Sequence, residues 1–224
     1  LTADQIAVLT TGQIQTLSST QFRALTTDQI GLLDTADFAS LNGSQIAGLT
    51  TAQLSAISAD NFAIFSSTQI QSLTGEQIQY LSSSQFATFD NADLSALTGS
   101  QISALTTSQV ASLSPERMTA FSTTQIQAFT TEQIYFMAND QLMAMTAEQI
   151  QAMTPEQVKS RILVRTINIE NSYIYSLTTE QVAAMTTDQI AGLTTNQVAQ
   201  FSTAQIQALT AEQIATLTTA QIPA

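Results

Sequence analysis

The sequence predicts an all-α solenoid made of short N-capped helical turns, one for each copy of an eight-residue repeat. Three observations predict this fold. Apolar residues recur every eight positions, a helix-capping pattern recurs in register with them, and acidic residues and proline stand where a helix start favours them. The repeat has the form Leu-Thr-x-x-Gln-Ile-x-x, and its positions are numbered 1 to 8 starting from Leu1.

The repeat covers almost the whole chain. Twenty octads fill residues 1–160 and six fill residues 177–224. Positions 1 and 6 are large and apolar in all 26 octads, position 2 is Ser, Thr, Asp or Asn in 25, with Ala138 as the exception, and position 5 is Gln in 22. We therefore predict two solenoid segments, 1–160 and 177–224, on either side of a non-repeat insertion at 161–176.

Each octad carries the signals of a helix start. Ser/Thr-x-x-Gln at positions 2 to 5 is a capping box, and the apolar positions 1 and 6 match the hydrophobic staple that flanks such a box. Twelve of the seventeen acidic residues occupy position 4, where negative charge complements the helix dipole. Pro115 and Pro155 occupy position 3, the first helical residue, which tolerates proline. The pattern therefore predicts one short helix per octad.

Other backbones fit this period less well. A continuous α-helix would leave a residual rotation of about 80° per octad, so its apolar positions would form no seam. In a flat strand, positions 1 and 6 would face opposite sides. A β-solenoid that turns between these positions remains the alternative fold, although the chain has only seven Gly and three Pro for such turns.

A single octad is too small to be stable. Burying two large apolar side chains contributes roughly 3–6 kcal/mol, whereas ordering eight backbone residues costs about 8–16 kcal/mol. Octads must therefore stack around a shared interior. A weaker period of 56 residues, in which Asp34-Thr-Ala-Asp37 reappears as Asp90-Asn-Ala-Asp93, indicates either duplication of a seven-octad block or a superhelix with about 28 residues per turn.

The insertion at 161–176 is rich in β-branched and aromatic residues, and apolar and polar residues alternate at 166–169 and 173–176, which predicts a small β-like element. Its residues Arg161, Arg165, Tyr173 and Tyr175 are the candidate interaction residues, because a basic strand could dock on an acidic neighbour. The alternative is that the segment replaces two octads, with Ile169 and Ile174 at core positions 1 and 6.

Composition excludes several kinds of chemistry. The chain contains no His and no Cys, which removes the commonest metal ligands and histidine acid–base catalysis. We expect no catalytic, metal or cofactor site, and we expect that the protein is not an enzyme. The net charge of −12 disfavours nucleic acid and anionic membranes as partners. No apolar run is long enough to span a bilayer, so no membrane insertion is expected.

Other conspicuous residues fit structural roles. The pairs Asp34–Asp37 and Asp90–Asp93 occupy the two capping-box positions, and Asn42, although it begins a glycosylation sequon, is also expected to cap a helix. The methionines Met137, Met143, Met145 and Met153, most of which stand at position 1, are expected to fill the core. Three aromatic side chains at positions 7 and 8, where small residues prevail, could mark a contact surface or local packing (Tyr80, Tyr135 and Phe136).

The runs Leu177-Thr-Thr-Glu-Gln-Val and Leu193-Thr-Thr-Asn-Gln-Val resemble the octad tracts of very large secreted bacterial surface proteins, described as adhesion or haem-utilisation exoproteins. The resemblance covers the 26 octads and not residues 161–176. It implies an extracellular or cell-surface, bacterial and structural setting. Haem binding finds no support, since the chain has neither His nor Cys for an axial ligand.

These observations lead to two expected functions. The first is a structural protein that acts as a stalk, a spacer or a self-assembling filament subunit, with self-association end to end or side by side. The second is a binding module that recognises a glycan, ice or a protein with one long face, for which the hydroxyls at position 3 are candidates.

Overall fold

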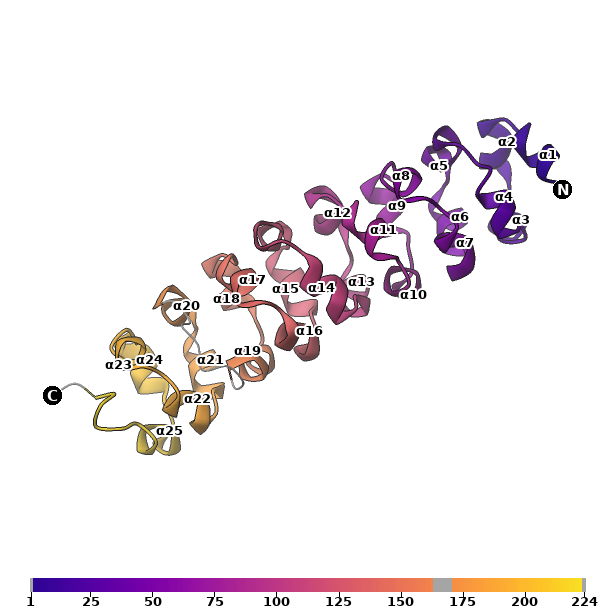
Figure 1. The fold of residues 1–224 in the computed structure, drawn as a ribbon. Coiled ribbons are helices and arrows are strands. Elements are labelled where there is room, and N and C mark those ends of the chain that lie inside the picture. The colour runs from indigo at the N-terminus through magenta and orange to yellow at the C-terminus, as the bar shows by residue number, and fades with distance from the viewer. Residues whose placement is uncertain (1, 163–170, 223–224) are drawn as a thin grey trace. The chain divides into compact units, whose positions relative to one another are not determined.

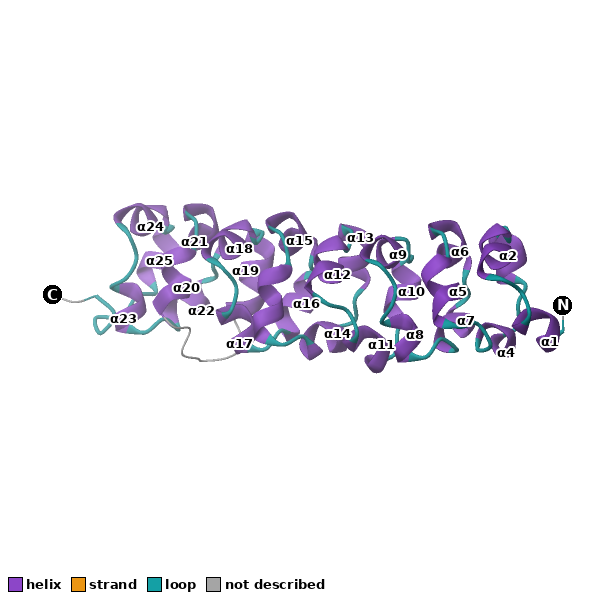
Figure 2. Cartoon of the chain, turned by 90° about the horizontal axis from the view of Figure 1, so that it is seen from above, coloured by secondary structure: helices purple, strands orange, loops and turns teal. Residues whose placement is uncertain are grey.

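The computed structural model describes residues 2–162 and 171–222, and all regular secondary structure in these ranges is helical (Figures 1 and 2). The chain divides into two compact units, unit 1 (Leu1–Ser112) and unit 2 (Leu113–Ala224). The predicted α-solenoid is confirmed, and the β-solenoid is unsupported, because the described part of the chain contains no strand. None of the described helices is long and apolar enough to cross a bilayer.

Unit 1 contains one helix of four to six residues in each octad. In chain order they are α1 (Ala3–Ala7), α2 (Thr11–Thr16), α3 (Ser19–Arg23), α4 (Thr27–Ile30), α5 (Thr35–Ser40), α6 (Gly43–Gly48), α7 (Thr51–Ser55), α8 (Ala59–Phe62), α9 (Ser67–Gln71), α10 (Gly75–Gln79), α11 (Ser83–Ala87), α12 (Asn91–Ala96), α13 (Gly99–Ala104) and α14 (Thr107–Ser112).

Unit 2 begins with a 3₁₀-helix and continues with short α-helices, the longest of which has eight residues. They are η1 (Pro115–Ala120), α15 (Thr123–Ala128), α16 (Thr131–Phe136), α17 (Asn139–Met143), α18 (Ala147–Ala152), α19 (Pro155–Ile162), α20 (Asn171–Ser176), α21 (Thr179–Ala184), α22 (Thr187–Ala191), α23 (Thr195–Val198), α24 (Thr203–Ala208) and α25 (Ala211–Ala215).

The predicted capping box forms in almost every described octad, and α10 is a typical case. The backbone N–H of Gln77 donates to the Thr74 hydroxyl at 3.1 Å, and the backbone N–H of Thr74 donates to Gln77 Oε1 at 2.8 Å. The helix ends after about one turn, where the backbone N–H of Leu81 donates to the carbonyl of Ile78. Ile78 at position 6 and Leu81 at position 1 are both buried.

The capping box changes where the sequence departs from the consensus. Ala138 has no side-chain acceptor, so the backbone N–H of Gln141 donates instead to Asp140 Oδ1 at 3.0 Å, while Gln141 Oε1 still accepts from the Ala138 backbone at 2.8 Å. Arg117 replaces Gln in the octad that contains Pro115, and that octad forms the 3₁₀-helix η1 without a side-chain cap on its N-terminus. Position 5 therefore influences the type of helix that follows the cap.

Within each unit, a helix packs against the helix three octads away. Contacts of this kind join α2 to α5, α3 to α6 and α10 to α13 in unit 1, and α15 to α18 and α16 to α19 in unit 2. In Figure 1, α3, α6 and α10 lie along one side of unit 1, and α2, α5 and α12 along the other. Side-chain hydrogen bonds connect residues 28 and 31 apart in both units, which agrees with the superhelix of about 28 residues per turn. Each such turn is called a coil below.

Positions 1 and 6 fill the interior of each unit, as the repeat predicts. Unit 1 contains a cluster of aromatic core residues whose ring centroids lie 4.8–6.2 Å apart, made by Phe38, Phe62, Phe65, Phe86 and Phe89. In unit 2, Met137, Met145 and Met153 at position 1 are buried, which confirms their core role. The core role predicted for Met143 is wrong, because this residue stands at position 7 and is 46% exposed.

Small residues let the helices of successive coils approach closely. A Cβ atom added at Gly43 would lie 2.5 Å from the Ser72 hydroxyl, and one added at Gly75 would lie 3.1 Å from the Cβ of Ala104. In both cases position 3 of one octad meets position 8 of the octad three further along. A side chain at Gly43 or Gly75 would require its neighbour to shift, which agrees with the prevalence of Ala, Gly, Ser and Thr at position 8.

The β-like element predicted at 161–176 is wrong for the part of it that the structure describes. Residues 161–162 extend α19, and residues 171–176, which include the alternating stretch at 173–176, form α20. Ile174 is fully buried at the phase of position 6, as expected if the segment replaces octads. Packing at a core position outweighs the β-propensity of its neighbours, because that propensity depends strongly on context. Ile169 and the stretch at 166–169 lie outside the described residues.

Candidate functional site: a ladder of glutamine side chains

The glutamine at position 5 makes contacts with two helices. Its Oε1 atom closes the capping box of its own helix, while its Nε2 atom points to the end of a helix one coil earlier. Gln77 Nε2 donates to the carbonyls of Ile46 and Leu49, both at 2.8 Å. These acceptors lie at positions 6 and 1, at the end of a helix, where carbonyls lack the N–H four residues on that continues a helix. The Ile46 carbonyl also accepts from the backbone N–H of Leu49 at 3.1 Å. One side chain therefore caps the start of one helix and the end of another.

The same arrangement recurs through both units, and we call it the glutamine ladder. Gln101 donates to the carbonyls of Ile70 and Leu73 at 2.9 and 2.7 Å. In unit 2, Gln181 donates to those of Ile150 and Met153 at 2.8 and 2.7 Å. Other glutamines whose Nε2 donates to a carbonyl 28, 30 or 31 residues earlier are Gln45, Gln53, Gln69, Gln85, Gln109, Gln141, Gln149, Gln157, Gln189, Gln205, Gln213 and Gln221.

The sequence pattern predicts the capping box but not the second contact, although a signal for it exists. A capping box accepts Glu as readily as Gln at this position. Position 5 contains no Glu in any octad, whereas the acidic residues at position 4 include several. Glu can supply the acceptor for the box but not a donor for carbonyls. The uniform choice of the amide therefore indicates that an Nε2 donor is needed.

Three octads of unit 1 replace this glutamine by a shorter side chain, Asp37, Asn61 or Asp93. At Asp93 the interaction between coils is reversed, because the Ser67 hydroxyl of the earlier coil donates to Asp93 Oδ1 at 2.9 Å. Asp37 and Asp93 accept from the backbone N–H groups of Asp34 and Asp90. The carboxylate pairs are thus capping boxes, as the spacing predicts.

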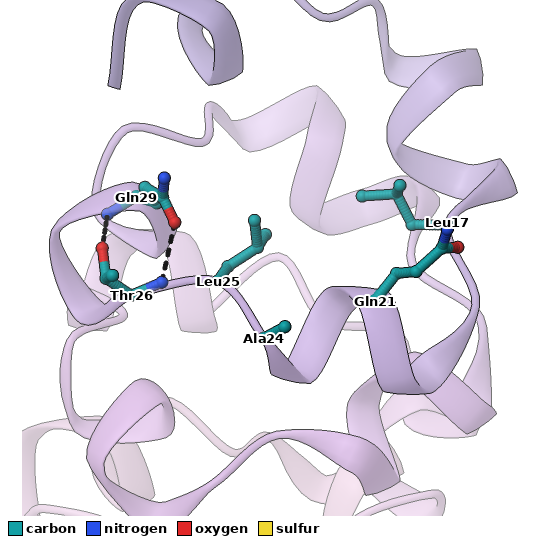
Figure 3. Close-up of a pocket in the computed structure, with 6 residues that line it drawn as sticks. All are labelled: Leu17, Gln21, Ala24, Leu25, Thr26 and Gln29. Carbon is teal, nitrogen blue, oxygen red and sulfur yellow. Dashed lines mark hydrogen bonds between the residues drawn. The ribbon is translucent and has the colours of Figure 1, made fainter. Parts of the chain in front are cut away.

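The ladder is open on the face of the first coil. Gln13 and Gln21 keep their capping boxes but are exposed, and within the described residues their Nε2 atoms have no acceptor. Beside them lies a cavity of about 400 Å³ lined by Leu17, Gln21, Ala24, Leu25, Thr26 and Gln29 (Figure 3). Leu17 at position 1 is half-buried there, whereas the position-1 residues from Leu25 to Met153 are buried. We call this surface, formed by residues 5–29, the donor edge.

The last coil of unit 2 presents the opposite surface. Its glutamines Gln205 and Gln213 are buried, but its position-6 residues Ile206 and Ile214 are 39% and 47% exposed. Position-6 residues that have a following coil are almost fully buried, as Ile78 illustrates at 0%. We call this surface, formed by residues 198–217, the acceptor edge, because its helices present the carbonyls that a following glutamine would bind. Each coil is therefore polar, with amide donors on one face and carbonyls with isoleucines on the other.

The structure describes only part of the predicted interaction segment, and α20 within it belongs to the ladder, since Gln205 Nε2 donates to the carbonyl of Ile174 at 3.0 Å. Arg161 belongs to α19 and Tyr173 to α20, and Arg165 lies outside the described residues. Tyr175 in α20 is 62% exposed. The ring of Tyr135 packs edge-on against that of Phe136 at 5.0 Å.

Two acidic residues at position 4, Glu116 and Glu148, interact with the start of their own helix. The backbone N–H of Glu148 and the Thr146 hydroxyl bond to the Glu148 carboxylate and lower its pKa below the ordinary value. The pKa of Glu116 is lowered in the same way by its backbone N–H and by Ser114. Both carboxylates are fully exposed, so they carry negative charge on the surface at neutral pH. Asn42 also caps its helix as expected, since its Oδ1 accepts from the Gln45 backbone at 3.0 Å.

Fold and ladder together define the class of this protein, an α-solenoid of octapeptide repeats. A family model described as the ALTTAQ repeat matches residues 1–35, 86–123 and 169–195. This match confirms the resemblance to an LTTxQ-type octapeptide-repeat tract. The third matched segment includes α20 (171–176), which agrees with its repeat-like core residue Ile174. No curated protein matches the chain.

Proposed function

We propose that this chain is a structural, non-enzymatic protein of the bacterial cell surface or extracellular space, which acts as a stalk or spacer. The observation that carries the proposal is the glutamine ladder. Each neutral hydrogen bond contributes about 1 kcal/mol net, and the ladder adds up to two between coils for each octad. Position 5, the most uniform polar position of the repeat, is thus used to hold one coil to the next.

The polar chemistry of the repeat supports a structural role over catalysis. The hydroxyls at position 2 and the carboxylates of Asp34, Asp37, Asp90 and Asp93 form capping boxes, and the acidic residues at position 4 lie at exposed helix starts. The extracellular setting rests on the resemblance to secreted repeat tracts. Absence of Cys also suits a long secreted chain, which must not cross-link in transit.

A spacer must hold its length, and this can be tested within unit 1. The chain contains no cysteine, so Gln15→Cys and Asn91→Cys would introduce a unique pair of exposed labelling sites. Pulsed electron–electron double resonance on the spin-labelled protein should give one narrow distribution of the distance between the two labels. Adding Gln53→Ala and Gln77→Ala, which removes two rungs between the labels, should broaden it. The labelled protein with all its glutamines in place serves as the reference. If its distance distribution is already as broad as that of a flexible chain, the proposal is contradicted.

A binding module is the second candidate function, favoured by the exposed aromatic side chains Tyr80, Phe136 and Tyr175 at positions 7 and 8. A glycan array and an ice-hysteresis assay would test it on the wild-type protein and on variants with Thr→Val changes at position 3. Tyr80→Ala and Phe136→Ala would test the aromatic residues. A spacer should give no signal in either assay, whereas signal that these substitutions remove would favour the binding module.

A further inference from the structure

Unit 1 has one side on which the glutamine ladder is interrupted in every turn. Between residues 25 and 112, position 5 is Gln in all octads except three, which carry Asp37, Asn61 and Asp93. These residues are 24 and 32 positions apart, which averages to the 28 residues of one turn. Their helices α5, α8 and α12 therefore share one side of the unit (Figure 1). We call the octads at 33–40, 57–64 and 89–96 the seam.

The other side of unit 1 keeps its rungs. The octads at 49–56, 73–80 and 105–112 stand two octads after those of the seam, which is 16 of the 28 residues in a turn and so just over half a turn away. Their glutamines Gln53, Gln77 and Gln109 each donate through Nε2 to a carbonyl of the preceding coil at 2.7–2.8 Å. We call these three octads the ladder side.

Hydrogen bonds between coils at the seam lie nearer the surface than the rungs do. The Ser67 hydroxyl donates to Asp93 Oδ1 at 2.9 Å in a half-buried position, and the exposed Gln71 Nε2 donates to the carbonyl of Ala96 at 3.1 Å. The side chain of Asn61 is one methylene shorter than that of Gln77. The seam thus lacks the buried amide donors that the ladder side has.

Aromatic rings fill the interior of the seam instead. Phe38 and Phe65 have ring centroids 6.2 Å apart, and Phe62 stacks on Phe89 at 6.0 Å. Both pairs join residues of successive coils. On the ladder side the corresponding buried residues are aliphatic, as Leu54 and Ile78 illustrate. The coils are therefore joined by buried hydrogen bonds on one side and by stacked rings on the other.

These two kinds of contact resist movement differently. A hydrogen bond weakens steeply when its geometry changes, whereas apolar attraction is non-directional and persists as side chains shift. We propose that unit 1 bends in one preferred direction, by opening and closing the seam while the ladder side keeps its spacing. This inference rests on the proposed spacer function and gives the spacer a direction in which it yields.

Two matched pairs of spin labels compare the two sides. Because the chain contains no Cys, Ala39→Cys with Ser95→Cys labels the seam alone, and Ser55→Cys with Ala111→Cys labels the ladder side alone. All four residues are exposed at position 7 of their octads, and each pair spans 56 residues, so the motion of the labels themselves contributes equally. Pulsed electron–electron double resonance should give a broader distance distribution for the seam pair than for the ladder-side pair.

The rungs can then be exchanged between the sides. Asn61→Gln with Asp93→Gln adds two rungs at the seam and should narrow the distribution of the seam pair. Gln77→Asn with Gln109→Asp gives the ladder side the short side chains found two octads earlier and should broaden the distribution of its pair. Each double substitution should leave the pair on the other side unchanged, so that each serves as the control for the other. Circular dichroism should confirm an unchanged helix content.

Two outcomes would overturn this inference. Equal widths for the two pairs in the protein with its natural position-5 residues would exclude it, and so would a broader distribution on the ladder side. This comparison alters no rung, so it decides the question even where a rung variant fails to fold. If both distributions are equally narrow, the seam fails and the spacer function stands. If both are as broad as that of a flexible chain, the spacer function itself fails.

Discussion

The octads at residues 9–24 and those at residues 73–104 share one repeat and one capping box, yet their glutamines have different surroundings. Gln13 and Gln21 are exposed, whereas Gln77 and Gln101 are about 3% and 2% exposed and bind carbonyls of the preceding coil. The helices are alike in both regions, so helix formation and capping do not require the preceding coil. The difference shows that the capping box is local, whereas the ladder requires a neighbouring coil.

The largest difference in stability loss should come from changing glutamine to glutamate in each of the two regions. Gln77→Glu keeps the capping-box acceptor but buries a carboxylate against the carbonyls of Ile46 and Leu49, each of which loses a donor. The Leu49 carbonyl loses its Gln77 donor, which costs about 1–3 kcal/mol, whereas the Ile46 carbonyl keeps the backbone N–H of Leu49 at 3.1 Å. The buried charge adds to this cost, so a total loss of at least about 3 kcal/mol is expected. Gln13→Glu should change stability by less than about 0.5 kcal/mol, because the side chain is exposed. Urea unfolding followed by circular dichroism measures both, and equal losses would contradict the distinction.

The second contrast concerns the apolar position 6. Ile78→Ala should cost about 2–5 kcal/mol, because the residue is fully buried beneath a following coil. Ile214→Ala should cost about half as much or less, since 47% of that side chain is already exposed. The comparison should be made on monomeric protein at low concentration. A loss at Ile214 equal to that at Ile78 would mean that the acceptor edge is covered in solution.

A rung of the ladder can also be added. Asn61 is too short to form the full capping box, and its octad retains only the Ser58 hydroxyl as a cap. Asn61→Gln would place an Nε2 donor in register with the carbonyls of Ile30 and Leu33, 31 and 28 residues earlier, and should stabilise unit 1 by about 1–2 kcal/mol. The expected result is a urea unfolding midpoint at higher urea concentration, with an unchanged dependence of the unfolding free energy on urea concentration. This result would confirm that the introduced glutamine forms the hydrogen bond between coils. No gain, or a loss, would show that the neighbouring aromatic core does not admit the longer side chain.

The smallest effect should come from the acidic helix starts. The folded-state pKa of Glu148 is lowered by its own backbone N–H and by Thr146, so the charged form stabilises the fold. This stabilisation is fully present above the pKa of the unfolded chain, near 4.3, and is lost as the pH falls through the lowered folded-state pKa. The stability of Glu148→Gln should therefore depend less on pH than that of wild type as the pH falls from the unfolded-chain pKa through the lowered folded-state pKa, and the two proteins should show the same pH dependence at neutral pH. If the free energy of unfolding changes equally with pH in wild type and in Glu148→Gln throughout the acid range, this role is contradicted.

Local signals in the sequence predicted most of the fold. The spacing of Thr74 and Gln77 is enough to predict a helix start, and the alternation of positions 1 and 6 is enough to predict which side chains are buried. The prediction of a strand at 173–176 was wrong because the repeat pattern of buried positions outweighs local β-propensity there. Tyr173 and Tyr175 have high β-propensity, but Ile174 between them keeps the phase of the repeat core, and burial at that position selects a helix.

By itself the sequence determined the helices, their caps and the apolar positions, because each of these depends on residues within one octad. The tertiary structure decided where the Nε2 atom of each position-5 glutamine goes, because its acceptors lie 28 and 31 residues away and become adjacent only when the chain has completed a turn. It also decided that two faces of a coil differ. An amide side chain that looks the same in every repeat is a buried connection where a coil precedes it and an open donor where none does.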